Sequence, residues 1–381
     1  MSKSATKIRN LGFAGGGFYG IAQVAALKEL ESFRDCLDIK QVCGVSVGSL
    51  VAALYSVGYN ADEMASIMFT LDFDALIKDN YFAYYSMYTS FGMYSATLLE
   101  EEIERLIRIK TNIRFCTFCQ ISKDLTVIST NLNYQCARFF NKNTTPNMPI
   151  SKAVRMSIGY PMIITPVLFE GDLYGDGGEF LNYPITTFQN LDETLGLTFS
   201  AHDENSDGTL KNRIPITDIY DYVKAIGSTM NRATYVSQIT EKHLKRSVVI
   251  HISENISSMQ FNLTADQKRI IYDCGARAVH EQIGSILGLS EEEVIARIAA
   301  ARPVPVTIMA IDQPDDTTST DTPPTDAIPT DTIPTDADLV CCVKSMAREA
   351  AVVVEGRSCS ALHPFGVVAI VAEATAKNSI Q

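Results

Sequence analysis

Two short apolar segments near the start of the chain each run into a glycine turn and then into a helical pattern. Ile8–Ala14 is followed by Gly15–Gly17 and then by residues 21–30, where apolar side chains recur at helical spacing. Ile39–Val45 leads through a second glycine-flanked turn into a helical pattern over Ser49–Val57. This alternation of strand, tight turn and helix predicts an α/β fold with a mainly parallel central sheet.

Later segments extend the same pattern. Apolar runs predict strands at Leu125–Thr130, Cys136–Phe140 and Ser247–Ile252, and helical periodicity covers Thr264–Leu287. A helix is predicted from Thr97, because Thr97 and Glu100 have the spacing of a capping box. Ser290 and Glu293 have the same spacing at the start of a helix that ends near Ala301. These last elements close the domain before an acidic segment begins.

The acidic segment, Ile311–Asp338, contains eight aspartates and no Lys, Arg or Glu. Thr-Asp-x-x-Pro repeats within it place a proline every five residues. Proline prevents helix and ladder hydrogen bonds and like charges extend the chain, so residues 306–338 are predicted to form a disordered linker. The rest divides into a main domain over 7–287, a C-terminal helix over 288–305 and a short segment over 339–381 of unknown role.

Charge and cysteine content exclude several classes of protein. A net charge of −12 argues against a nucleic-acid partner, because binding phosphate backbones needs a basic surface. No apolar run approaches the ~20 residues of a membrane-spanning helix, and the N-terminus lacks the apolar segment of a secretory signal. Nine cysteines, an odd number, favour a reducing, cytoplasmic location. Cys116 and Cys119 have metal-ligand spacing without a second pair, so we expect no metal there. We also expect no cofactor.

The first glycine turn, Gly15–Gly20, fits more than one function. It matches the dinucleotide-binding pattern G-x-G-x-x-G, but Asp38 precedes the second strand instead of following it, as that pattern requires. It fails the phosphate-binding pattern because no Lys-Ser or Lys-Thr follows. In either case, amides at a glycine-rich helix entry point outward, so we expect them to stabilise a developing negative charge.

The second glycine turn, Gly44-Val45-Ser46-Val47-Gly48, has the G-x-S-x-G pattern of a nucleophile elbow. Its glycines permit a cramped strand-to-helix turn that exposes the serine oxygen, and the following helix places its positive end beneath that oxygen. A small-residue turn with a capping serine is the alternative. We predict that Ser46 is a nucleophile.

A serine nucleophile needs a base, and the sequence offers histidine or aspartate. The histidines are His202, His243, His251, His280 and His363. None lies in an obvious loop after a late strand, and position 46 is early for the nucleophile of an α/β-hydrolase, so a histidine triad is the weaker hypothesis. Asp176 lies between glycines in Tyr174–Gly178, where the chain can bend tightly and approach another segment. Taken alone, that motif also fits an ordinary turn.

Together, in order, these motifs resemble those of the patatin-like phospholipase family: a G-G-G-x-[KR]-G loop, a G-x-S-x-G elbow and a D-G-[GA] motif. Ala153–Pro161 and Asp176–Pro184 are also similar to the family's segments before and after its aspartate. Ile256–Leu263 and the helix after it resemble the usual end of the family's domain. The resemblance covers roughly residues 7–287 and implies a three-layer α/β/α fold.

The resemblance also implies a function, which is acyl-ester hydrolysis by a phospholipase of the A type. Ser46 would be the nucleophile and Asp176 its partner in a dyad without histidine, acting through an acyl-serine intermediate. The amides of Gly15, Gly16 and Gly17 would form the oxyanion hole. The implied partners are a phospholipid or other lipid ester and, transiently, a membrane surface; whether a protein activator is needed is not indicated.

Two positions depart from the family pattern. Tyr19 stands where Lys or Arg is usual, and Ala14 where an acidic residue is common. The missing cation weakens the expected help to an oxyanion or a lipid phosphate, and Arg155 is a candidate for a compensating contact. Two alternatives therefore stay open: a catalytically weak lipid-binding or scaffold protein on the same fold, and a nucleotide-binding α/β protein.

Residues 81–94 form a dense aromatic and methionine segment between two helical regions. Aromatic rings suit the boundary between lipid headgroups and acyl chains, so this segment is a candidate for lipid contact. The alternative is that these side chains fill the core beneath a cap.

Overall fold

The computed structural model describes residues 7–78, 83–200, 215–252, 256–260 and 262–301. The chain divides into two units, Met1–Ala310 and Ile311–Gln381, and every described residue lies in the first. The predictions for the linker over 306–338 and for the segment over 339–381 fall outside the described residues.

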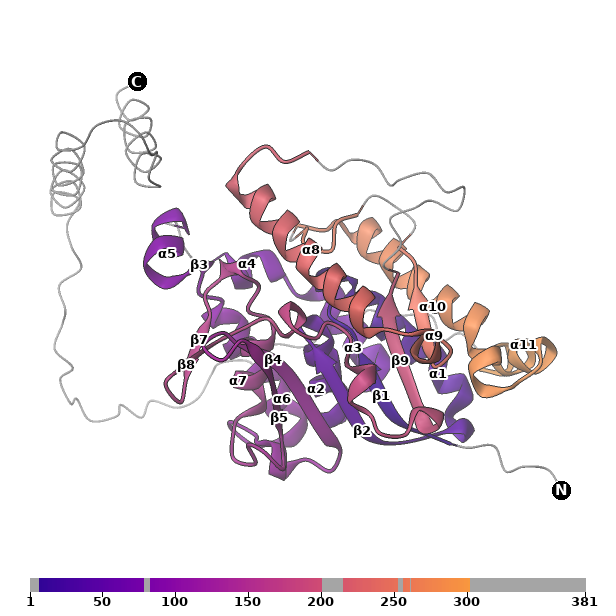
Figure 1. The fold of residues 1–381 in the computed structure, drawn as a ribbon. Coiled ribbons are helices and arrows are strands. Elements are labelled where there is room, and N and C mark those ends of the chain that lie inside the picture. The colour runs from indigo at the N-terminus through magenta and orange to yellow at the C-terminus, as the bar shows by residue number, and fades with distance from the viewer. Residues whose placement is uncertain (1–6, 79–82, 201–214, 253–255, 261, 302–381) are drawn as a thin grey trace, which may run out of the picture. The chain divides into compact units, whose positions relative to one another are not determined.

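An eight-stranded sheet forms the centre of the domain (Figure 1). Five adjacent strands are parallel, in the order β10 (Ser247–Ile250), β9 (Thr194–Phe199), β1 (Ile8–Phe13), β2 (Leu37–Val45) and β4 (Asp124–Asn131). The antiparallel strands beyond β4 are β5 (Cys136–Asn141), β8 (Asp172–Gly175) and β7 (Val167–Phe169). A separate parallel pair joins β3 (Gly92–Tyr94) and β6 (Met162–Ile164). The predicted mainly parallel sheet is confirmed.

Helices cover one face of the sheet and bury most of the core with it. The helix α1 (Gly20–Leu30) packs against α10 (Ala265–Leu287) and α3 (Ala61–Thr70). Next to it, α2 (Val47–Val57) packs on β2 and β4 and contacts α6 (Thr97–Thr111) and α7 (Ile150–Ser157). Apolar side chains of these helices and of the sheet form one continuous cluster.

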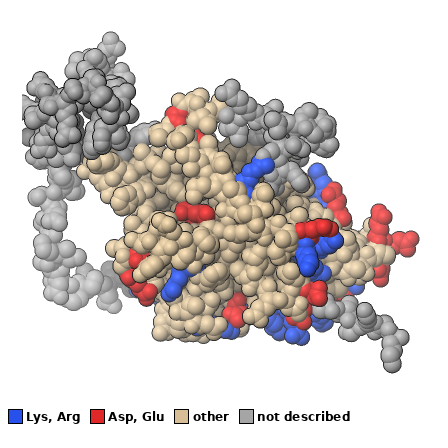
Figure 2. Space-filling model, viewed as in Figure 1, with Lys and Arg blue, Asp and Glu red and all other residues tan. Residues whose placement is uncertain are grey.

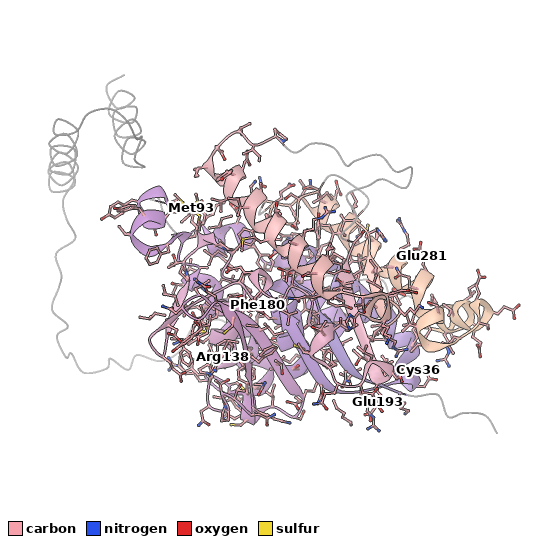
Figure 3. All side chains as sticks on the ribbon, viewed as in Figure 1. Cys36, Met93, Arg138, Phe180, Glu193 and Glu281 are labelled. Atoms are coloured by element: carbon pink, nitrogen blue, oxygen red, sulfur yellow. The ribbon has the colours of Figure 1, made fainter. Side chains whose placement is uncertain are left out.

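A thinner layer covers the opposite face. Cys43 points to this face because it alternates along β2 with Val42, and it shares a small apolar cluster with Leu181. The 3-10 turns between residues 184 and 193, together with α8 (Ile219–Gln238), complete the layer. Side chains fill the space on both sides of the sheet (Figure 3). The expected three-layer α/β/α arrangement is therefore present, with unequal outer layers.

The shorter helices are α4 (Phe73–Ile77), α5 (Ala83–Ser90), α9 (Glu241–Leu244) and α11 (Glu291–Ala300). The capping box of Ser290 and Glu293 is present at α11. The one expected at Thr97 is wrong: Thr97 is already helical, Ala96 before it is left-handed, and the Ser95 hydroxyl accepts the Thr97 N–H at 3.2 Å. In the described parts of the chain, no helix has the length and apolar character to cross a bilayer.

The aromatic segment is divided between surface and core. Tyr85, Tyr88 and Phe91 expose 61%, 70% and 60% of their area, whereas Met93 in β3 is buried. Residues 79–82 lie outside the described structure. On the face seen in Figure 2, charged side chains gather mainly at the end of the domain that carries α9 and α11.

Candidate active site

Ser46 occupies the turn between β2 and α2 in a conformation that L-residues rarely adopt, with φ 51° and ψ −131°. The flanking glycines make this turn possible. A Cβ at Gly48 would lie 2.5 Å from the carbonyl oxygens of Phe13 and Ala14. A Cβ at Gly44 would clash with the backbone of residue 48. A strained conformation of this kind costs of order 1–3 kcal/mol, and here it holds the hydroxyl at the N-terminus of α2.

Ser157 fixes the elbow from the neighbouring elements. The backbone N–H of Ser46 donates to Oγ of Ser157 at 2.8 Å, and that hydroxyl donates to the carbonyl oxygen of Ile128 at 2.5 Å. Ser157 is fully buried at the end of α7, and Ile128 belongs to β4. The turn at Ser46 is thus tied to a strand and a helix that follow it in the chain.

Asp176 follows β8 and brings its carboxylate to Ser46. The Ser46 hydroxyl donates to Oδ2 at 2.7 Å, and the Gly178 N–H donates to Oδ1 at 2.7 Å. The Asp176 backbone is also fixed, because its N–H donates to the Gly159 carbonyl at 2.9 Å and its carbonyl accepts the Thr130 hydroxyl at 2.8 Å. Two predicted residues that lie 130 positions apart in the chain are therefore joined by a hydrogen bond.

Burial controls the acidity of this carboxyl group, of which only 3% is exposed. Loss of water raises the pKa of Asp176 from 3.8 to about 6, while the hydrogen bonds from Ser46 and Gly178 oppose that rise. Burial, and then the negative charge of Asp176, raise the pKa of the neighbouring Glu179 to about 8. At neutral pH the site therefore holds an ionised Asp176, more basic than an exposed aspartate, beside a protonated Glu179.

The glycine loop lies next to the Ser46 side chain. A Cβ at Gly15 would lie 3.1 Å from Cβ of Ser46, but the Gly15 N–H already donates to the Asn182 carbonyl at 2.9 Å. Within the described residues, the N–H groups of Gly16 and Gly17 donate no hydrogen bond. They precede α1, where the helix dipole favours negative charge. Of the three predicted oxyanion donors, Gly16 and Gly17 therefore have amides available, and Gly15 does not.

Tyr19, in place of the family's cation, anchors the glycine loop to a distant segment. Its hydroxyl donates to the Ile256 carbonyl at 2.6 Å, its ring contacts Phe199 at 5.4 Å between centroids, and the Phe18 N–H donates to the Ser258 carbonyl at 2.9 Å. Burial raises the pKa of Tyr19, so it remains a neutral hydrogen-bond donor. The loop's position is thus set by bonds to residues 256–258.

An apolar cavity opens beside the dyad. Ser46 and Asp176 line it together with Val47, Leu50, Leu99, Ile158 and other apolar side chains. A cavity of this composition accommodates hydrocarbon and keeps the polar groups of Ser46 and Asp176 at its wall.

Comparison with known proteins identifies the family. Residues 11–188 match the model of the patatin-like phospholipase family, and the chain is 29% identical to a probable lipid hydrolase of Invertebrate iridescent virus 6, over 46% of this chain and 62% of that one. The chain belongs to the patatin-like phospholipase family. An uncharacterized protein of Acanthamoeba polyphaga mimivirus is 58% identical over 74% of this chain and 95% of its own length. VipD from Legionella pneumophila shares the fold, with a TM-score of 0.53 and 14% identity over 74% of this chain and 67% of that one.

Arg155, considered as a substitute for the missing patatin-family cation, is not part of this site. Only 3% of it is exposed, and its guanidinium donates to the carbonyl oxygens of Ser95 and Thr165, the latter at 2.8 Å. It is not among the described residues that line the cavity beside Ser46. Its position joins α7 to the segments before α6 and after β6, so we assign no substrate contact to it.

The histidines do not supply the base in the described structure. His280 on α10 pairs with Glu29 at 2.6 Å, and His243 caps α9 with Thr240. His251 is exposed just after β10, and His202 and His363 lie outside the described residues. No group of three or more His, Cys, Asp or Glu among the described residues could hold a metal ion, and Cys116 is buried whereas Cys119 is exposed.

The sequence does not mark the residues that hold the serine elbow and the glycine loop in place. Ser157 and Asn182 lie inside the two segments that resemble the family, and that resemblance was the available signal. Neither residue has a local pattern that marks it. Their roles come from contacts with Ser46 and Gly15, more than a hundred positions away in the chain.

Proposed function

We propose that this protein is a lipid acyl hydrolase of the phospholipase A type, with Ser46 as nucleophile and Asp176 as its base. The observation that supports it most is the 2.7 Å hydrogen bond from Ser46 to the buried carboxylate. The glycine loop approaches Ser46 at Gly15, and within the described residues its amides at Gly16 and Gly17 donate no hydrogen bond. A nucleophile, a base and oxyanion donors are the groups that acyl transfer requires.

In the first half-reaction the Ser46 oxygen attacks the ester carbonyl carbon as its proton passes to Oδ2 of Asp176. The carbonyl oxygen becomes an oxyanion, which the amides of Gly16 and Gly17 stabilise; each such donor is worth ~2.7–4 kcal/mol. The tetrahedral intermediate then expels the alcohol, which takes the proton from Asp176. An acyl-Ser46 ester and a free alcohol result.

The second half-reaction reverses these proton movements with water. Asp176 takes a proton from a water molecule, whose oxygen attacks the acyl-Ser46 carbon. Collapse of the second intermediate returns the proton to Ser46 and releases the fatty acid. A pKa of about 6 suits this alternation, because the carboxylate is ionised at neutral pH yet basic enough to hold the transferred proton.

The apolar cavity supports a lipid ester as substrate. We also propose contact with a membrane surface through exposed aromatic side chains. Tyr85, Tyr88 and Phe91 at α5 are the described aromatic residues best suited to a headgroup boundary.

We also propose a cytoplasmic location, supported by six free cysteines among the described residues. The chemistry described needs no metal or cofactor.

Labelling with a fluorophosphonate probe tests the proposal. Wild-type protein should be labelled, Ser46→Ala should not, and Ser285→Ala, an exposed serine on α10, should label as wild type does. Wild type and Ser285→Ala should also release fatty acid from phospholipid vesicles, with or without EDTA, and Ser46→Ala should not. An unlabelled, inactive wild type that binds vesicles would instead support the alternative, a lipid-binding or scaffold protein.

A further inference from the structure

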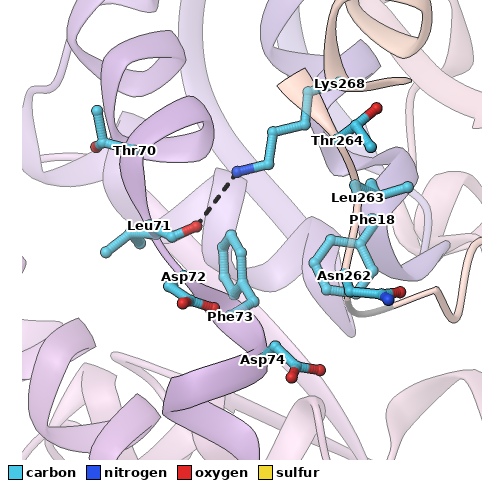
Figure 4. Close-up of a pocket in the computed structure, with 10 residues that line it drawn as sticks. All are labelled: Phe18, Thr70, Leu71, Asp72, Phe73, Asp74, Asn262, Leu263, Thr264 and Lys268. Carbon is cyan, nitrogen blue, oxygen red and sulfur yellow. Dashed lines mark hydrogen bonds between the residues drawn. The ribbon is translucent and has the colours of Figure 1, made fainter. Parts of the chain in front are cut away.

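A second cavity, of about 400 Å³, shares lining residues with the one beside Ser46. Figure 4 shows the residues that line this second cavity. Its lining differs in character, because Asp72, Asp74, Asn262, Thr264 and Lys268 supply polar or charged groups. The cavity at the dyad, in contrast, is lined almost entirely by apolar side chains. The domain thus has an apolar compartment at the nucleophile and a polar compartment next to it.

Two aromatic rings belong to both compartments. Phe18, which follows the glycine loop, and Phe73, at the start of α4, line both cavities and are the residues they share. The rings meet edge to face, with centroids 5.4 Å apart, and each residue is 7% exposed (Figure 4). This Phe18–Phe73 pair is therefore the wall where the two cavities meet.

The wall is held in place by Lys268 of α10. Its ammonium donates to the carbonyl oxygens of Met68, Phe69 and Leu71, at 3.2, 2.9 and 3.3 Å (Figure 4 shows the bond to Leu71). These carbonyls end α3, two to five residues before Phe73. All three N–H groups of the ammonium thus donate to the backbone that positions Phe73, so Lys268 stabilises the position of the wall.

We propose that the Phe18–Phe73 pair is the end wall of an acyl channel and sets the longest acyl chain that the Ser46 site accepts. This inference rests on the proposed function. A chain bound at Ser46 would gain from each methylene buried in the apolar cavity until it meets these rings. The methylenes of a longer chain would have to displace the rings and would then enter the second cavity, which is lined by charged and polar groups. In apolar pockets one methylene changes specificity by about tenfold.

The test is the chain-length profile of kcat/KM for p-nitrophenyl esters from butanoate to dodecanoate, kept below their micelle-forming concentrations. Phe73→Ala joins the two cavities, so the ratio of kcat/KM for the longest to the shortest ester should rise at least tenfold. Phe73→Val should produce a smaller rise in the same direction. Leu263→Ala changes the lining of the second cavity and keeps both rings of the wall, so it should leave the ratio at its wild-type value.

Thermal unfolding establishes which variants are folded. If Phe73→Ala does not fold, Phe73→Val is tested in its place. A folded Phe73 variant that hydrolyses the short ester with an unchanged chain-length ratio would overturn the wall and leave the hydrolase intact. An equal rise in the chain-length ratio for Leu263→Ala would also overturn the role of the wall, because the effect would then come from a general loosening of the structure. If wild-type protein neither hydrolyses any ester nor reacts with the fluorophosphonate, the proposed function fails, and the wall's role fails with it.

Discussion

Replacing Asp176 with Asn should stop catalysis and, above pH 6, make the protein more stable. Asn keeps an oxygen that can accept the Gly178 N–H, but it cannot take a proton from Ser46. Because Asp176 is buried, its pKa is about 6 instead of the ordinary 3.8. At about 1.36 kcal/mol for each unit of pKa, the folded protein bears a cost of about 3 kcal/mol when this carboxyl group ionises.

The sign of the pH dependence follows from the raised pKa. The folded state binds this proton more tightly than the unfolded state, so the contribution of Asp176 to stability is complete below pH 4 and is lost as the pH rises through 6. Asn does not ionise. The free energy of unfolding of Asp176→Asn relative to wild type should therefore increase by about 2.4 kcal/mol between pH 4 and pH 7.

Urea unfolding at several pH values between 4 and 7 measures this difference, provided that the m-value is unchanged. Glu179 must be controlled, because the charge of Asp176 contributes to its raised pKa. The comparison is therefore repeated in a Glu179→Gln background. Asp273→Asn, on an exposed part of α10, controls for loss of a surface carboxylate. A stability difference that stays constant from pH 4 to pH 7 would refute the assignment of a buried, costly charge to Asp176.

Three further outcomes follow from the site. The value of kcat/KM should rise with pH to a plateau with an apparent pKa of about 6, because Asp176 accepts a proton only when ionised; a flat profile from pH 5 to 8 would contradict its role as base. Gly17→Ala should lower kcat at least ~100-fold, because Gly17 has φ 51° and a Cβ there would clash with a carbonyl oxygen; near-normal turnover would exclude its amide from the oxyanion hole. Ser157→Ala should lower the free energy of unfolding by about 1–3 kcal/mol, since the Ser46 N–H loses its buried acceptor, and urea unfolding measures it.

The elements that could be read from the sequence have strong local signals. The two segments Ile8–Leu30 and Ile39–Val57 each contain a strand, a glycine turn and a helix, with apolar periodicity and glycines that the turn requires. Both segments form as predicted. β9 was not predicted, although it lies between β1 and β10 at the centre of the parallel sheet. Its place in the sheet depends on pairing with strands distant in sequence. The capping box expected at Thr97 is wrong for a local reason, because the left-handed Ala96 before it is the N-cap and Thr97 is already helical.

The sequence by itself determined the chemical groups: a serine in a glycine elbow, an aspartate between glycines and a glycine-rich helix entry, since each needs a backbone shape that only certain residues allow. Tertiary structure decided how these groups act. It buried Asp176 and so raised its pKa, engaged the amide of Gly15 with Asn182, and turned Arg155 to backbone carbonyls away from the cavity. The bonds from Ser46 to Asp176 and from Gly15 to Asn182 join segments more than a hundred residues apart, and local sequence carries little information about such contacts.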